Sequence, residues 1–283
     1  MDKGLLAYLY IPLLTAVIIP FLPKSKPKLA DLFANVTLLA GLANLAWLCL
    51  RPSVVASGFI SVPGDGLSIL LVGLIYLVAI CVTFFSANYL PEDMPNRSAY
   101  YSLLLVSAAA MCGIVTTADF FTLYVYIEVL AVTTFALITA DESLKGIEGA
   151  LKYFLLTFPA SALIIAGISV LLLTLGSLSF ESLRAAMSAG APAGPVMFGV
   201  ALMTLGFLIK AGVAPFHTWT PDAYQGAYAP VSAHLGGIVT KISGVYAVLK
   251  TATLMNFFDG RALGLSGGIM FLGMLSIAVG ALA

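Results

Sequence analysis

Long apolar blocks without any charge run through this sequence and restrict what it can fold into. Clear examples are residues 67–85, 103–117 and 154–175, which reach or approach the roughly 20 residues that a helix needs to cross a bilayer. Inside lipid, every backbone N–H and C=O group must be bonded within the protein, so only helices or a closed barrel can span the membrane. The blocks are continuously apolar and do not alternate, which excludes the barrel. The sequence therefore predicts an all-α, polytopic transmembrane bundle.

Composition supports this class and excludes others. The 283 residues are 61% hydrophobic and 9% charged, whereas roughly a quarter of the residues in a soluble domain are charged. The formal net charge is zero, and basic residues gather only around Lys26, so nucleic-acid binding has no electrostatic footprint. The first span lacks the small-residue cleavage site of a signal peptide, and we expect it to remain in the mature protein.

The apolar blocks predict about eight or nine spans joined by links too short to be domains. Their expected ranges are 5–22, 31–50, 67–85, 98–117, 120–140, 146–175, 195–213, 229–249 and 262–283. Cytoplasmic loops carry an excess of lysine and arginine, and the first loop holds Lys24, Lys26 and Lys28. We therefore expect an integral protein of the cytoplasmic membrane with its N-terminus outside.

The cysteines give no sign of a metal centre. Cys49, Cys81 and Cys112 lie singly in apolar spans, without the close spacing that zinc or iron–sulfur ligation requires. We interpret them as buried structural thiols. No cofactor motif is present either, so we expect neither a metal nor a cofactor, and no redox centre in this chain.

Three charged residues interrupt the apolar spans. Glu128, Lys210 and Lys241 each lie far from the nearest charge in sequence. A charge at mid-membrane costs about 2.5 to 3.5 kcal/mol on insertion scales, so such residues are functional candidates. Burial disfavours the charged form of each group and a nearby opposite charge favours it, so moving one charge would switch the protonation of the set. The simpler alternatives are lysines that extend to the headgroups and a neutral, hydrogen-bonded glutamic acid.

A broken helix is expected between Lys210 and His217, because Gly212 and Pro215 weaken and then remove helical hydrogen bonds. Broken helices are tolerated where they line a hydrated cavity, and transporters use them as ion sites. His234 precedes Lys241 by seven residues, which on a regular helix is two turns along one face. Both histidines are candidates for a proton relay; the alternative is a side chain bonded to a backbone carbonyl.

These residues carry a family resemblance. The stretches Leu205–Tyr224, Ala229–Ala233 and Thr240–Tyr246, together with Phe120–Leu130 and Gly149–Phe154, resemble the antiporter-like membrane subunits shared by respiratory complex I, membrane-bound hydrogenases and Mrp-type sodium/proton antiporters. The resemblance covers roughly residues 65–250. It implies two inverted five-helix repeats, each with one broken helix, and a line of buried Glu and Lys along the membrane midplane.

The resemblance also implies roles for single residues. Glu128 matches the acid whose pairing changes during turnover, Lys210 is its partner, and Lys241 is the central relay. Lys152 resembles the lysine that opens the sixth span, with a weaker role. His234 departs from the pattern, because members with a histidine on the eighth helix tend to carry it about two residues later.

Members of this family usually have about fourteen helices, and this sequence ends at Ala283, early in the second repeat. We expect N-terminal helices over 1–97, a five-helix repeat over 98–253 and the start of an incomplete repeat over 254–283. Either a partner subunit supplies the other half or the chain is a degenerate, mainly structural copy.

The leading hypothesis is a proton- or sodium-translocating subunit of a complex I-like or hydrogenase-like assembly, with other membrane subunits and the lipid bilayer as partners. A non-conducting assembly subunit is the alternative, and a stand-alone transporter of a small solute is the third.

Overall fold

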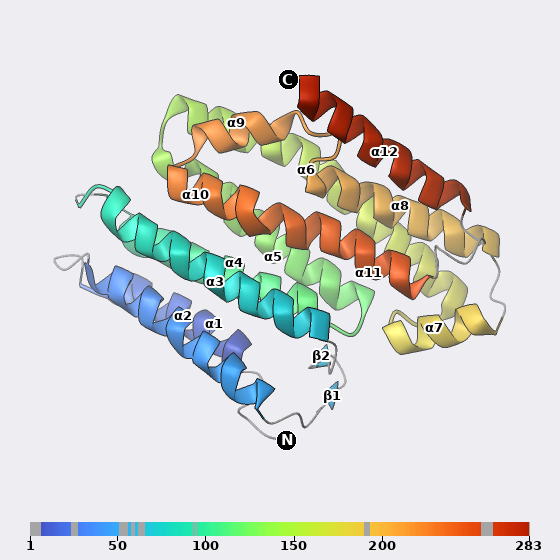
Figure 1. Ribbon diagram of the computed structural model, residues 1–283, viewed down its shortest axis with the longest axis horizontal. Helices are drawn as coiled ribbons and strands as arrows, with labels where there is room; N and C mark the ends of the chain where they lie inside the picture. Colours follow the sequence, from blue (N-terminus) through green and yellow to red (C-terminus); the bar gives the residue numbers. More distant parts are fainter. Residues whose placement is uncertain are drawn as a thin grey trace.

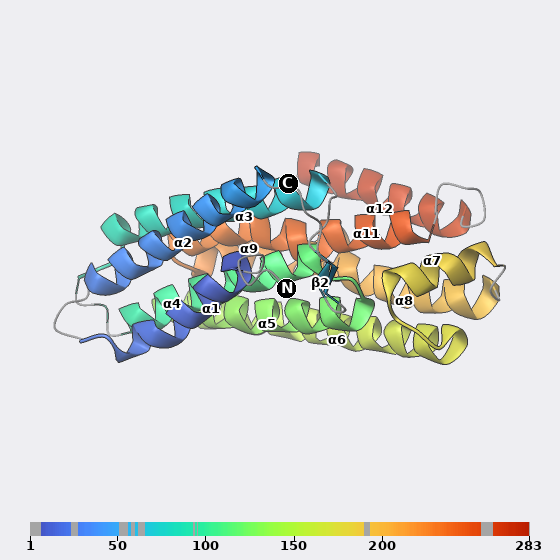
Figure 2. The ribbon, with the colours of Figure 1, turned by 90° about the horizontal axis from the view of Figure 1, so that it is seen from below.

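The computed structural model describes residues 7–23, 28–50, 56–57, 60–61, 66–92, 94, 96–189, 193–255 and 263–282. Long helices lie side by side in one bundle (Figures 1 and 2), with a two-residue antiparallel strand pair at one end. The elements are α1 (Ala7–Ile18), η1 (Ile19–Phe21), α2 (Lys28–Cys49), β1 (Ala56–Ser57), β2 (Ile60–Ser61), α3 (Gly66–Tyr89), α4 (Arg97–Thr116), α5 (Phe120–Ile138), η2 (Thr139–Asp141), α6 (Leu144–Leu175), α7 (Phe180–Ser188), α8 (Ala193–Ala211), α9 (Trp219–Gly226), α10 (Ala229–His234), η3 (Leu235–Val239), η4 (Lys241–Tyr246), α11 (Ala247–Leu254) and α12 (Leu263–Leu282).

The predicted helical class and the positions of the spans are confirmed. Within the described ranges, 7 helices are long and apolar enough to cross a membrane. Two further predicted spans are the shorter apolar segment Tyr8–Phe21 and the helix from Ala229 to Leu254, which two π-helical segments, η3 and η4, interrupt.

Capping residues fix where the central helices begin and end. Asp119 accepts a hydrogen bond from the Thr122 N–H at 2.7 Å, and the Ser143 hydroxyl accepts one from the Gly146 N–H at 3.0 Å, so each satisfies a free amide in a first turn. Gly176 ends α6 in the left-handed conformation with φ of 70°, which glycine adopts without strain. With 32 residues, α6 is about 48 Å long, so it tilts or extends beyond the roughly 30 Å hydrocarbon layer.

Helix α7 lies where the sequence predicted only a link. Its first residues join the start of α5, because Phe180 N–H donates to the Ala118 carbonyl at 2.9 Å and Phe120 N–H donates to the Leu178 carbonyl at 3.2 Å. The Phe120 and Phe180 rings also meet edge to face, with centroids 5.0 Å apart. Nine residues are too few to span a bilayer, so a search for long apolar blocks does not detect this helix.

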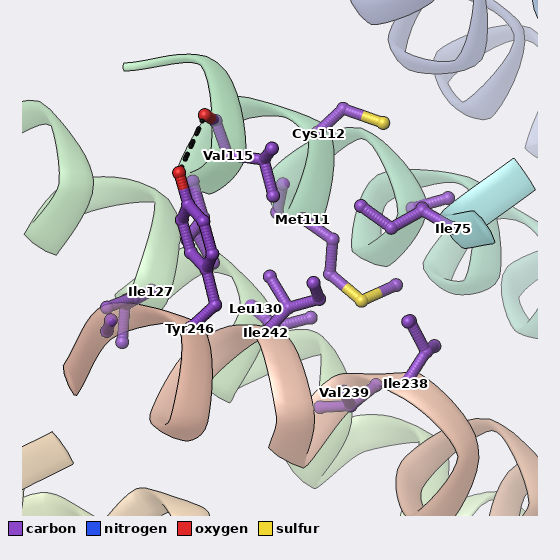
Figure 3. Close-up of a cluster of buried hydrophobic side chains, with 14 of the residues drawn as sticks. Ile75, Met111, Cys112, Val115, Ile127, Leu130, Ile238, Val239, Ile242 and Tyr246 are labelled. Atoms are coloured by element: carbon purple, nitrogen blue, oxygen red, sulfur yellow. Dashed lines mark hydrogen bonds between the residues drawn. The ribbon is translucent and has the colours of Figure 1, made fainter. Parts of the chain in front are cut away.

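A buried apolar cluster joins α3, α4, α5 and the π-helical segments (Figure 3). Ile75, Met111, Leu130 and Ile242 are each at most 1% exposed. The Tyr246 hydroxyl donates to the Val115 carbonyl at 3.1 Å, and Val115 lies in the last turn of α4, where helical carbonyls lack partners within their own helix. The cluster fixes the helix that carries Lys241 against the α4–α5 pair.

Helices α6 and α8 approach each other through glycines. A Cβ atom on Gly206 would lie 2.6 Å from the Ala160 carbonyl oxygen, and one on Gly199 would lie 3.0 Å from the Gly167 carbonyl oxygen. Small residues allow this approach in membrane bundles. Because Lys210 follows Gly206 by one turn, the contact sets the distance between Lys210 and α6.

One end of the bundle contains a buried ion pair that the sequence did not reveal. Arg97 is 3% exposed, and its Nε and Nη2 donate to the two carboxylate oxygens of Asp31 at 2.9 and 2.7 Å. Its remaining donors reach the carbonyls of Ala87, Leu90 and Pro91. Arg97 therefore joins α2, the end of α3 and the start of α4.

The interpretation of the cysteines was partly wrong. Cys112 is buried, but Cys49 and Cys81 are exposed. In a membrane protein, a thiol has apolar neighbours whether it faces the lipid or the core. Apolar flanking sequence therefore does not distinguish an exposed cysteine from a buried one.

Candidate functional site

Lys210 lies in the last turn of α8 and is 4% exposed. The C-terminal end of a helix favours a cation, because the unpaired carbonyls there carry partial negative charge. The helix stops one residue later, at Ala211.

The chain is interrupted between Lys210 and His217, as the sequence predicts. Gly212 has φ of 70° and the Ala214–Pro215 peptide bond is cis, while the next helix begins at Trp219. Other parts of the chain satisfy the freed backbone groups: Trp219 Nε1 donates to the Ile209 carbonyl at 3.3 Å, and Ala214 N–H donates to Ser276 Oγ of α12 at 2.9 Å.

Glu128 and Lys210 form an ion pair between α5 and the end of α8. Lys210 Nζ lies 3.3 Å from Glu128 Oε1, and the exposed fractions of the two side chains are 3% and 33%. Ser161 of α6 donates to the same Oε1 at 2.6 Å. The predicted proximity of Glu128 and Lys210 is therefore confirmed. A third helix, α6, contributes a hydroxyl that was not among the predicted site residues.

A small cavity adjoins Lys210 and is lined in part by α5, the helix that carries Glu128. Besides Lys210, its lining includes five residues with hydroxyl groups: Thr134, Tyr153, Thr157, Thr240 and Ser243. It has room for roughly one water molecule. An ammonium has three N–H donors, and Lys210 Nζ makes no hydrogen bond of regular geometry within the described chain. A water in this polar cavity would supply the missing acceptor.

Lys241 lies in the middle of its helix, as predicted, but its side chain is exposed, so the expectation of a buried position was wrong. Its Nζ donates to the Gly236 carbonyl and contacts Thr240 Oγ1 at 3.3 Å. The two π-helical segments cause the difference. Their i→i+5 bonding places more residues in each turn than an α-helix has, which rotates Lys241 away from the face that contains His234.

His234 is fully buried, at 0% exposure, and its Nε2 lies 2.8 Å from Ser107 Oγ. The Ser107 hydroxyl donates to the Leu104 carbonyl. Within the described residues, His234 Nδ1 has no hydrogen-bond partner. The seven-residue spacing to Lys241 does not put the two on one face.

His217 and Lys152 lie apart from the Glu128–Lys210 pair in their contacts. His217 is half-buried in the interruption after α8, and its Nδ1 lacks a partner in the part of the chain described. Lys152 pairs with Glu148 at 2.7 Å and with Asp222 at 2.8 Å, which joins α6 to α9. The Glu148–Lys152 spacing of four is readable from sequence, whereas Asp222 is distant in the chain.

A family profile described as NADH:quinone oxidoreductase/Mrp antiporter, TM, matches residues 117–283. The chain belongs to this family. The match includes the acid of α5, the broken helix and the π-helical segments, so the resemblance deduced from the sequence is confirmed.

Curated members of the family are similar over much of the chain. NADH-quinone oxidoreductase subunit N of Thioalkalivibrio sulfidiphilus is 29% identical over 263 residues, which are 92% of this chain and 54% of that protein. The subunit N of Granulibacter bethesdensis is 32% identical over 200 residues, 70% of this chain and 41% of that protein. The chain thus spans about half the length of the curated relatives it matches.

Solved members share the fold. Respiratory complex I from Thermus thermophilus contains a chain that is 28% identical, with a TM-score of 0.73 over 87% of this chain and 53% of that one. An archaeal membrane-bound sulfane sulfur reductase gives a TM-score of 0.87 at 22% identity, over 97% and 58% of the two chains. The Mrp complex of Dietzia gives 0.80 at 21% identity, over 94% and 51%. The chain is therefore a membrane antiporter-like subunit by fold and family.

Proposed function

We propose that this chain translocates protons, or sodium ions, within a larger energy-converting membrane complex. The observation that carries the proposal is the buried Lys210 ammonium, held at the end of a broken helix 3.3 Å from Glu128. A structural ion pair needs no interrupted helix and no adjoining polar cavity, and both are present here. Transporters use broken helices to place ion sites at membrane depth.

The proposed relay runs from Glu128 through Lys210 to Lys241. Glu128 stabilises the ammonium form of Lys210, so any step that draws Glu128 away favours release of the Lys210 proton. The cavity lies between Lys210 and Thr240, and Thr240 Oγ1 contacts Lys241 Nζ. One water in the cavity would complete a hydrogen-bonded route of Lys210, water, Thr240 and Lys241. His217 belongs to the proposed route because it lies in the interruption; His234 and Lys152 have lesser roles.

The partners and orientation are part of the same proposal. We propose that other membrane subunits, one of them supplying a second repeat, complete the route, and that redox chemistry takes place in neighbouring subunits. In this scheme residues 98–253 form the five-helix repeat, between the helices of 1–97 and 254–283. The ends of the helices that carry Lys28, Arg97 and Lys145 face the cytoplasm, which places the N-terminus outside the cytoplasmic membrane.

Ion pumping by membranes that contain the assembled complex tests the relay. Glu128→Gln and Lys210→Ala should each reduce pumping at least tenfold, because each removes a charge that the switch requires. Glu181→Gln is the matched control, since Glu181 is exposed on α7, and it should pump normally at equal expression. Near-normal pumping by Glu128→Gln or Lys210→Ala would refute the relay.

A non-conducting assembly subunit is the alternative, and the exposed position of Lys241 favours it. Under that hypothesis, Glu128→Gln and Lys210→Ala lower the amount of assembled complex but leave pumping per complex unchanged. Normalising pumping to the amount of complex therefore decides between the two functions.

A further inference from the structure

Thr133 and Thr134 are neighbours on α5 whose hydroxyl groups have different environments. Both side chains are buried, at 5% and 1% exposure. The Thr133 hydroxyl donates to the Val129 and Leu130 carbonyls at 3.1 and 2.9 Å, which is a common arrangement for a threonine inside a helix. Thr134 Oγ1 makes no hydrogen bond of regular geometry with the described residues. A buried polar atom in this situation is rare and requires an explanation.

Thr134 lines the same small cavity as Lys210. Both side chains are at most 4% exposed, and Lys210 Nζ also makes no regular hydrogen bond within the described ranges. The cavity has room for roughly one water molecule, and a buried water needs two to four polar partners. An ammonium that donates and a hydroxyl that accepts are two such partners.

The cavity is formed within this chain. Its lining comes from α5, α6, the end of α8, the start of α9 and the helix from Ala229 to Leu254. Trp219 and Leu235, which are part of the lining, are each at most 1% exposed. The Tyr153 phenol of α6 also lines the cavity and interacts with Thr134. The site therefore does not depend on what lies against the outer surface of the bundle.

We propose that Thr134 is a positioning residue of the relay and holds one water molecule against the Lys210 ammonium. Lys210 Nζ donates to the water oxygen, and the water donates to Thr134 Oγ1. Glu128, about 9 Å away along the axis of the same helix, binds the ammonium directly. Helix α5 thus acts on Lys210 twice, through a carboxylate and through a water. The proposal rests on the proposed function, in which this water lies on the route from Lys210.

Ion pumping per assembled complex tests the role of the hydroxyl. Thr134→Val replaces the hydroxyl by a methyl group of the same shape and should lower pumping by at least about fivefold. Thr134→Ser keeps the hydroxyl and should restore most of the activity. Thr133→Val is the matched control and should pump normally, because the Thr133 hydroxyl bonds only within its own helix turn in the described chain.

Thr204→Val is a second control, for the removal of any unpartnered buried hydroxyl. Thr204 of α8 is 1% exposed and its Oγ1 has no hydrogen-bond partner among the described residues, but it does not line the cavity. We expect normal pumping from this variant. A loss as large as that of Thr134→Val would overturn the assignment, because the effect would not then be specific to the cavity.

A density map of the assembled complex that resolves ordered water tests the site without measuring activity. We expect a water within about 2.7 to 3.2 Å of both Thr134 Oγ1 and Lys210 Nζ, and its loss in Thr134→Val. A cavity without water density in the unsubstituted complex would overturn the proposal.

Lys210→Ala distinguishes failure of this inference from failure of the proposed function. If Lys210→Ala loses pumping and Thr134→Val does not, the relay stands and Thr134 has no positioning role. Normal pumping by Lys210→Ala would refute the relay itself and the role of Thr134 with it. Equal losses with Thr134→Ser and Thr134→Val would show that the size of the side chain matters and not its hydroxyl. A smaller amount of complex with unchanged pumping per complex would assign Thr134 a structural role only.

Discussion

Ser161 of α6 forms a hydrogen bond with the carboxylate of the Glu128–Lys210 pair. Its hydroxyl donates at 2.6 Å to the same carboxylate oxygen that lies 3.3 Å from Lys210. Hydrogen bonds to charged groups contribute about 1.5 to 3 kcal/mol, and Ser161 is almost fully buried, so water does not easily replace its hydroxyl. The hydroxyl therefore holds the Glu128 carboxylate in position beside Lys210.

Ser161→Ala should lower ion pumping by about tenfold, the effect of a contribution near 1.4 kcal/mol. The substitution removes one methyl-sized polar group and leaves the helix intact. Ser169→Ala is the matched control, because Ser169 is exposed on the same helix and its hydroxyl donates to the Ile165 carbonyl one turn earlier. Pumping normalised to the amount of complex is the measurement, and equal rates for the two variants would show that Ser161 has no part in the relay.

The sequence revealed those residues whose placement in the membrane costs free energy. Glu128 and Lys210 were predictable because charges are expensive in an apolar span, so their presence requires an explanation. Ser161 carries no such cost, because a serine hydroxyl can bond to the carbonyl four residues back, as Ser161 also does with Thr157. Pairings across the chain, such as Arg97 with Asp31, depend on packing that no local pattern records.

The elements of this bundle were largely predictable, and the differences have physical causes. Span positions follow from the length of apolar blocks, and the broken helix follows from Gly212 and Pro215. The π-helical segments were missed because Gly236, Gly237 and Gly244 are compatible with several helical geometries, and the local sequence does not select one of them. Without the π-helical segments, Lys241 was expected in the interior, whereas the structure places it on the surface. Helix α7 was missed because it is too short and too polar to be read as a span.

Loss of one partner of the Arg97–Asp31 pair should destabilise the junction of α2, α3 and α4. Removing one member of a buried pair leaves an uncompensated charge and costs about 3 to 5 kcal/mol. Asp31→Asn and Arg97→Met should therefore both lower the midpoint of thermal unfolding in detergent. Lys28→Ala is the control, because its pair with Glu92 is exposed, at 76% and 78%, and such pairs contribute about 0 to 1 kcal/mol.

The double variant Asp31→Leu with Arg97→Met separates two explanations of that loss. If the charge left unpaired causes the destabilisation, the double variant should unfold at a higher temperature than either single variant, because no buried charge remains. A loss equal to the sum of the single losses would indicate that the carbonyl contacts of Arg97 matter more than its charge.

Considered as a whole, the molecule buries one part of the proposed relay and exposes the other. Lys210 and the small cavity lie inside the bundle with Glu128 half-buried beside them, whereas Lys241 is exposed. The family and the proximity of Glu128 to Lys210 could be predicted from the sequence, but the exposure of Lys241 could not, because exposure depends on how the helices pack.

Lys241→Arg should show whether Lys241 acts through its charge or through its proton. Arginine remains charged at any accessible pH, so it keeps the positive charge but cannot release a proton. We expect the Arg and Ala variants both to lose most ion pumping. Lys145→Arg is the control, because Lys145 is exposed at the start of α6, and it should pump normally. Full pumping with Lys241→Arg would mean that only the charge is needed, which would remove Lys241 from the proton relay.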